Sequence, residues 1–257
     1  MNEITHALSY PRVLFVFSLI VLWLAGRTGA ALGRRLPLKA DERDDFGIVQ
    51  AATLTLLGLI IGFSFSMAIS RYDQRKNYEE EEANAIGTEY VRANLLSASD
   101  APKVRVLLRR YLDQRLLFYV TRDERRLQAI NQDTSQIQSE MWSVVQAAAA
   151  VKPTPTVALA VSGMNDVLNS QGYTQAAWQN RIPISAWVLM LAIALLGSGL
   201  VGYGARATKI TGGLLLVLPL ALSIAFLLIA DIDSPRRGFI NVRPQNLLSL
   251  SESLPRQ

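Results

Sequence analysis

The sequence contains no cysteine and only one histidine, His6, among its 257 residues. The lack of cysteine excludes disulfide frameworks, thiol nucleophiles, iron–sulfur clusters and every zinc site that uses thiolate ligands. A lone histidine near the N-terminus excludes a His-rich metal cage and a conventional Ser–His triad. Since no other catalytic constellation is present, we expect no enzyme, no catalytic residue, no cofactor and no metal.

Charge is missing from four long segments. Asp, Glu, Lys and Arg are absent from residues 13–26, 46–70, 182–205 and 210–230, although they make up 18% of the chain. About 20 apolar residues span the hydrocarbon core of a bilayer, so the pattern predicts four transmembrane helices. Residues 30–32 lengthen the first. Its alternative is a cleaved signal peptide, but the clearly positive N-terminal region of such peptides is missing.

The basic residues that flank these segments divide almost evenly between the two sides, so the positive-inside rule does not orient the chain. The excess of positive charge is only five. Arg34, Arg35 and Lys39 are closely followed by acidic residues at 41–45. This mixture suits lipid head groups rather than nucleic acid, which binds an uninterrupted basic surface.

Residues 71–181 are polar, nearly neutral and rich in helix formers, with little proline or glycine before Pro153. We expect the second span to continue as a helix to about Leu96, followed by a helix that begins at an Asp100 cap and by helices over 134–151 and 156–169. No strand pattern is present. The predicted fold is an all-α membrane protein with a helical domain inserted between the second and third transmembrane helices. Its divisions are 1–70 for the first two spans, 71–181 for the extramembrane domain, 182–232 for the last two spans and 233–257 for a C-terminal tail.

Two glycine motifs in the third span mimic known binding sites. Residues 197–202 match the G-x-G-x-x-G string of dinucleotide sites, but that fingerprint needs an α/β unit, so we interpret it as close packing between membrane helices. Residues 201–204, Val-Gly-Tyr-Gly, resemble a potassium-channel filter, but too few residues follow for a re-entrant loop. We expect a tight interhelical turn there.

The second span carries two neighbouring stripes. Gly58, Gly62 and Ser66 form a stripe of small residues that is typical of contacts between membrane helices. Thr55, Leu59 and Phe63 form a stripe of larger, mostly apolar residues. The second stripe is either ordinary lipid or helix contact, or a hydrophobic constriction repeated around an oligomer axis, which gates by dewetting.

Acidic residues occur at two further places. Four consecutive glutamates, residues 79–82, cover every face of a helix, which favours a solvated surface over a metal site or an ion-attracting ring. Asp231 and Asp233 close the fourth span just before Arg236 and Arg237. These two carboxylates could pair with the arginines, cap a turn or bind calcium.

Several strings resemble the bestrophin-like domain family of bacterial membrane proteins. They are residues 63–76, Phe-Ser-Phe-Ser-Met-Ala-Ile-Ser-Arg-Tyr-Asp-Gln-Arg-Lys, residues 82–92, which begin Glu-Ala-Asn-Ala-Ile-Gly-Thr, and residues 230–238, Ala-Asp-Ile-Asp-Ser-Pro-Arg-Arg-Gly. The resemblance covers most of the chain. The motif residues are Glu82, Asn84, Gly87, Asp231, Asp233 and Arg236.

More distantly, the order of elements is similar to that of bestrophin channels, which are pentamers with four membrane helices per subunit, a helical cytosolic domain and both termini inside. The resemblance implies that the second helix lines a pore. It places Thr55, Leu59 and Phe63 at an apolar neck, with Gly58, Gly62 and Ser66 in helix packing. The implied cytosolic mouth consists of Arg71, Arg75 and Lys76. The chain departs from the bestrophin pattern at Tyr72-Asp73, where a double tryptophan is usual, and in lacking an acidic calcium clasp beyond Asp231 and Asp233.

We therefore expect a homopentameric ion channel of the bacterial inner membrane, multi-pass, with cytoplasmic termini. Its partners are the bilayer, inorganic ions and copies of itself. The alternative is a non-conducting scaffold or signalling protein that binds a partner through residues 71–181.

Overall fold

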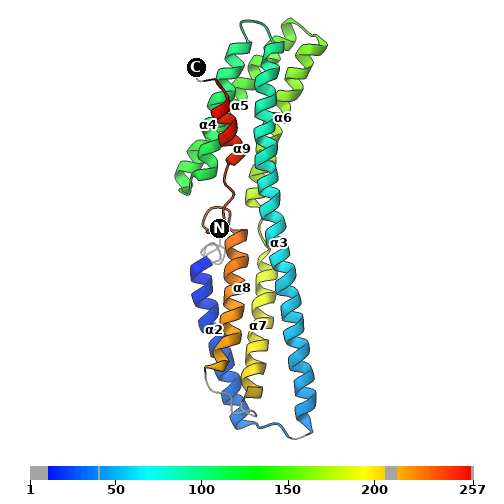
Figure 1. The fold of residues 1–257 in the computed structure, drawn as a ribbon, viewed down its shortest axis with the longest axis vertical. Coiled ribbons are helices and arrows are strands. Elements are labelled where there is room, and N and C mark those ends of the chain that lie inside the picture. Colours follow the sequence, from blue (N-terminus) through cyan, green and yellow to red (C-terminus); the bar gives the residue numbers. More distant parts are fainter. Residues whose placement is uncertain (1–10, 40, 206–212, 256–257) are drawn as a thin grey trace. The chain divides into compact units, whose positions relative to one another are not determined.

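The computed structural model describes residues 11–39, 41–205 and 213–255. Every regular element in these residues is a helix, which confirms the all-α class for this part of the chain (Figure 1). The elements are α2 (Pro11–Arg35), α3 (Glu42–Arg92), η1 (Ala93–Leu95), α4 (Ala101–Val120), α5 (Glu124–Val151), α6 (Pro155–Gln179), α7 (Ile184–Ala205), η3 (Leu214–Leu216), α8 (Val217–Asp233) and α9 (Gln245–Ser253).

Four helical segments are long and apolar enough to cross a membrane: Pro11–Arg35, Glu42–Leu95, Pro155–Ala205 and Leu214–Asp233. The first three contain a predicted charge-free span in full and the fourth contains most of one, so the four predicted spans correspond to four candidate membrane helices. The beginning of the fourth predicted span, residues 210–212, lies outside the described residues. The second segment continues far beyond the apolar stretch because no proline or glycine interrupts residues 63–86.

The chain divides into two compact units. Unit 1 comprises Met1–Arg71 and Arg181–Asn241, and unit 2 comprises Tyr72–Asn180 and Val242–Gln257. Helix α3 contributes residues to both units. The segment assigned above to a C-terminal tail contains α9, which belongs to unit 2.

Within unit 1, α2 packs on α7 and α8 (Figure 1). Glycines allow the closest approach: a Cβ atom on Gly29 would overlap the carbonyl oxygen of Gly199, and one on Gly202 would overlap that of Gly26. The two backbones therefore touch, which supports the expectation of close packing in the third span. The turn predicted at residues 201–204 is wrong, because α7 continues as a helix to Ala205.

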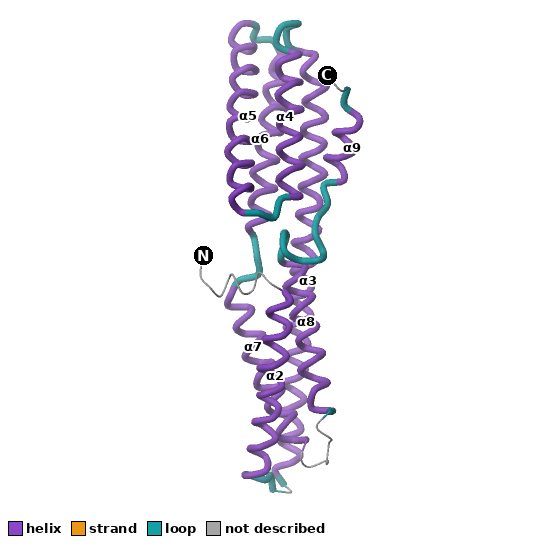
Figure 2. Tube along the Cα trace, turned by 90° about the vertical axis from the view of Figure 1, so that its left-hand side faces the viewer, coloured by secondary structure: helices purple, strands orange, loops and turns teal. Residues whose placement is uncertain are grey.

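Unit 2 contains α4, α5 and α6, which lie alongside one another (Figure 2). Helix α4 buries one face, whose members recur at three- and four-residue spacing: Val104, Leu107, Leu108, Tyr111, Leu112, Arg115 and Tyr119. Phe118 and Tyr119 pack edge-on against Trp178 of α6, with ring centroids 5.1 and 5.2 Å away. Such aromatic contacts join the C-terminal ends of α4 and α6.

Two helices are longer than predicted. Helix α5 begins at Glu124, not at residue 134, because the carboxylate of Asp123 accepts the backbone N–H of Arg126 at 2.8 Å and caps the helix. Helix α6 passes through Gly172 and ends at Gln179. One glycine in an exposed helix costs only about 1 kcal/mol relative to alanine, so it did not end this helix.

The short helix α9 is held at both ends by side chains of opposite charge. Glu79 of α3 accepts the backbone N–H of Leu247 at 3.0 Å, at the positive end of the α9 dipole. Arg109 of α4 donates to the carbonyl oxygens of Ser251 and Leu254, at 3.4 and 3.1 Å, at the negative end. The C-terminal segment is thus fixed to unit 2 by complementary charges.

Candidate functional site

The apolar part of α3 is the least covered of the four membrane helices. Only 6% of its most apolar window is buried, against 28–44% for the other three. Its buried positions in this part include Leu57, Ser64 and Ala68. At about 100° per residue these positions lie roughly 160° around the helix from Leu59. Most of the circumference of α3 is therefore open in the single chain.

The three residues of the predicted neck lie on this open side. Leu59 is 54% exposed and Phe63 is 65% exposed, and Thr55 one turn earlier is exposed as well. At about 1.5 Å per residue the stripe extends roughly 12 Å along the helix. It offers large apolar side chains that no part of the described chain covers.

The small-residue stripe lies next to the neck residues on the same open side. No atom lies within 4 Å of a Cβ built on Gly58 or Gly62, and Ser66 is exposed. These glycines therefore make no close contact within one chain, unlike the glycines of α2 and α7. They leave a shallow surface onto which another helix could pack closely.

The three residues predicted at a charged pore mouth differ in exposure within the single chain. Lys76 is exposed, but Arg71 is largely covered and donates to Asp233 at 3.5 Å. Arg75 is buried and donates to the carbonyl oxygens of Ala177 and Asn180, at 3.1 and 3.2 Å. The guanidinium of Arg75 therefore stabilises the C-terminal end of α6. Its place at a pore mouth stays a prediction.

The closing motif after α8 is a folded corner. Asp231 accepts the backbone N–H groups of Phe239 and Ile240, at 2.7 and 2.8 Å. A Cβ atom at Gly238 would overlap the carbonyl oxygen of Asp231, which explains the glycine of the motif. Of the roles considered for Asp231, turn capping is the one observed.

Asp233 has a similar structural task. Its carboxylate accepts the N–H of Ile182 at 3.1 Å, just before α7, besides its ion pair with Arg71. Arg236 is half-buried. Among the described residues no group of three or more His, Cys, Asp or Glu side chains is arranged to hold a metal ion.

The sequence predicted a solvated surface for the acidic run 79–82, but only part of this run is exposed. Glu80 and Glu81 are exposed, but Glu79 and Glu82 are buried. Glu82 forms an ion pair with Arg115 of α4, and both side chains are fully buried. It also accepts the hydroxyl of Thr174 of α6 at 3.1 Å. One face of this charged run thus joins α3, α4 and α6.

This pair also changes the acidity of its neighbours. Burial and the negative charge of Glu82 raise the pKa of Tyr119 and Tyr111, so both phenols stay protonated. The carboxylate of Glu82 raises the pKa of Arg115 further above its usual range, against the effect of burial. A fixed charge pair surrounded by neutral phenols is suited to structural support, not to proton transfer.

Two further motif residues differ in role. Asn84 is exposed on α3. Gly87 faces α9, where a Cβ atom would lie 3.1 Å from a methyl carbon of Leu250. The small size of Gly87 therefore allows α9 to pack on α3.

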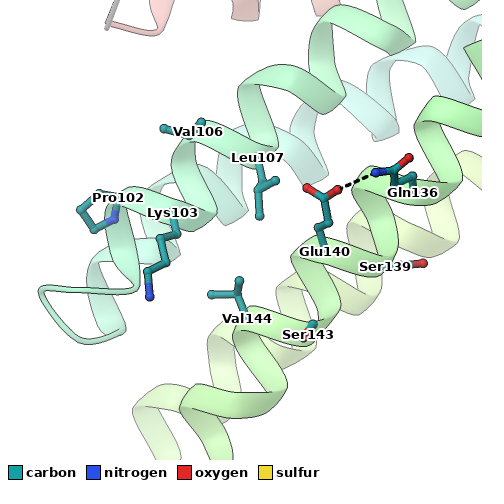
Figure 3. A pocket seen from close by; sticks show the side chains of 9 residues that line it. All are labelled: Pro102, Lys103, Val106, Leu107, Gln136, Ser139, Glu140, Ser143 and Val144. Atoms are coloured by element: carbon teal, nitrogen blue, oxygen red, sulfur yellow. Dashed lines mark hydrogen bonds between the residues drawn. The ribbon is translucent and has the colours of Figure 1, made fainter.

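Unit 2 also has a groove of about 910 Å³ between α4 and α5 (Figure 3). Leu107 of α4 points toward α5 across it, and Lys103, Val106 and Val144 also line it. Glu140 in its wall is already bonded to Gln136 at 3.1 Å and to Arg110 at 3.3 Å. The groove is mostly apolar and presents no catalytic or ligand-binding constellation.

Comparison with known proteins gives a family and a fold. The model of the Bestrophin-like domain matches residues 13–247. No curated protein matches the sequence significantly. A crystal structure of a bacterial bestrophin homolog from Klebsiella pneumoniae has a TM-score of 0.65 at 14% identity, over 93% of this chain and 99% of that one. A point variant of that homolog gives the same score and identity over 93% and 97%. A further crystal structure, described as a membrane protein, has a TM-score of 0.66 at 14% identity over 93% and 99%.

The family match covers most of the chain, and the fold similarity extends over nearly all of each similar structure. The strings noted in the sequence, residues 63–76, 82–92 and 230–238, all lie inside the matched range. Residues 63–76 contribute to the open side of α3, and residues 82–92 contain the Glu82 that pairs with α4 and α6. Residues 230–238 form the corner after α8. The chain belongs to the Bestrophin-like domain family.

Proposed function

We propose that this protein is an ion channel of the bacterial inner membrane, formed by several copies of the chain around a pore lined by α3. The open side of α3 supports the proposal most directly. A helix that leaves apolar residues and close-packing glycines uncovered within one chain is suited to pairing with other copies. Membership of the Bestrophin-like domain family favours five copies, with both termini and residues 71–181 in the cytoplasm.

In this assembly Thr55, Leu59 and Phe63 repeat around the axis as an apolar neck. An apolar constriction resists ion passage because the ion must shed its hydration without replacement ligands, so such a neck gates by dewetting. Gly58, Gly62 and Ser66 let adjacent α3 helices approach closely. Lys76 contributes the exposed charge at the cytoplasmic end, with Arg71 largely neutralised by Asp233.

Removal of the two large neck side chains should raise ion flux. In liposomes that contain the purified protein, we expect the double variant Leu59→Ala/Phe63→Ala to conduct at least tenfold faster, which corresponds to a barrier lower by about 1.4 kcal/mol. The matched control is Phe17→Ala/Leu189→Ala, which removes the same groups from exposed positions of α2 and α7. The control should conduct as the unmodified protein does.

Native mass spectrometry of each variant should give the same complex as the unmodified protein, which we expect to hold five copies. Unchanged flux in a neck variant that keeps this mass would contradict the gate. A monomer, with no flux in any variant, would instead favour a non-conducting scaffold.

A further inference from the structure

Glu89 is a buried carboxyl group that the proposed pore does not use. It lies on α3 in unit 2 and is fully buried. Neither of its carboxyl oxygens has a hydrogen-bond partner among the described residues. Buried carboxylates are costly unless they are paired or hydrogen-bonded, so its surroundings favour the neutral form.

The carboxyl group is enclosed by close contact with α6. A Cβ atom built on Gly163 would overlap Glu89 Oε2 and would lie 2.7 Å from Nη1 of Arg92. Glycine at position 163 therefore lets α3 and α6 approach so closely that little room for water remains beside the carboxyl group.

Two charged residues act on Glu89, one from each helix. Arg92 of α3 favours its ionised form and Asp166 of α6 opposes it, while burial has the largest effect and opposes it too. Burial and Asp166 outweigh Arg92, so the pKa of Glu89 is raised to about 8. The carboxyl group is thus mostly protonated at neutral pH and ionises in mildly alkaline solution.

We propose that the contact between Glu89 and Gly163 is a proton-operated switch, closed while the carboxyl group is neutral and loosened when its proton leaves for the solvent. The resulting carboxylate needs hydrogen-bond partners, and neither of its oxygens has one in the closed contact, so α3 and α6 move apart to admit water. Because α3 is one helix from Glu42 to Arg92, this movement acts on the helix that lines the proposed pore. Regulation of the pore rests on the proposed channel, whereas the switch itself does not.

The movement can be measured without ion flux. Since the chain has no cysteine, spin labels attached through Thr88→Cys on α3 and Asn165→Cys on α6 occupy only these two exposed positions. Between about pH 6 and about pH 10 we expect the distance between the labels to increase, with a midpoint near the pKa of Glu89.

Glu89→Gln should abolish this shift and keep the short distance at every pH, because its amide cannot ionise. Glu81→Gln, which removes an exposed carboxylate from the same helix, should leave the shift intact. A distance that does not change with pH, or that changes equally in Glu89→Gln, would overturn the switch.

Flux measurements in liposomes test the link to the pore separately. We expect a step in flux over the same pH range, which Glu89→Gln removes. Label distances that change while flux stays constant would overturn the regulation of the pore and leave the switch supported. A pH-dependent distance without flux at any pH would support the switch and contradict the channel.

Discussion

Replacement of Glu82 by alanine is expected to lower the free energy of unfolding by about 3–5 kcal/mol, the usual cost of breaking a buried ion pair. The variant would leave the guanidinium of Arg115 buried without its counter-charge. It would also remove the acceptor of the Thr174 hydroxyl. Because the pair joins α3, α4 and α6, its loss should loosen the whole of unit 2. Chemical denaturation in detergent, followed by the fluorescence of Trp178 and the other tryptophans, measures the change.

Two further variants distinguish charge from packing. Glu81→Ala changes the exposed neighbour and should alter stability by less than about 0.5 kcal/mol. Glu82→Leu/Arg115→Met replaces both charged side chains by apolar ones. It should restore most of the stability, because no buried charge is then left without a partner. An equal loss in Glu82→Ala and Glu81→Ala would show that the buried pair is not structural.

Introduction of a side chain at Gly202 is the second large effect that we expect. Gly202→Val would force its Cβ atom into the carbonyl oxygen of Gly26. The obstructing atom is backbone and not the flexible end of a side chain, so α2 and α7 must separate along their length. Overpacking costs typically 1–3 kcal/mol where side chains can yield, and we expect more than about 3 kcal/mol here.

Thermal unfolding of the purified protein measures this loss. Gly47→Ala is the control, since nothing lies within 4 Å of a Cβ atom at Gly47. It should be neutral or stabilising, because alanine is favoured over glycine within a helix. A Gly202→Val protein as stable as the Gly47→Ala protein would contradict the contact between α2 and α7.

The membrane helices could be predicted from the sequence because the bilayer imposes a simple rule on length and charge. Residues 46–70 and 184–205 lie in helices where the missing charges indicated spans. Local signals were weaker at helix ends. Residues 124–133 were missed because α5 starts at the Asp123 cap. Gly204 was read as a turn although it lies inside α7, where a Cβ atom would come within 2.9 Å of the Phe46 ring.

Burial of charged residues could not be read from the charged run 79–82 alone. Helix α3 buries two of these four glutamates, Glu79 and Glu82. Only their partners, Leu247 and Arg115, show which two are buried. One signal was available: Arg115 falls on the apolar face of α4, where an ionisable residue needs a buried partner. Arg75 and Glu89 gave no such signal, because their surroundings come from α6, about 100 and 75 residues along the chain.

The neck residues remain a prediction that reaction with a thiol reagent tests directly. The unmodified chain has no cysteine, so a water-soluble cationic thiol reagent should leave its flux unchanged. In liposomes that contain Thr55→Cys or Leu59→Cys protein, we predict that the reagent blocks most of the ion flux, because the attached charge lies in the pore. Leu189→Cys, on the similarly exposed α7 position, should lose none. Full flux after complete labelling of Leu59→Cys would contradict a pore lined by α3.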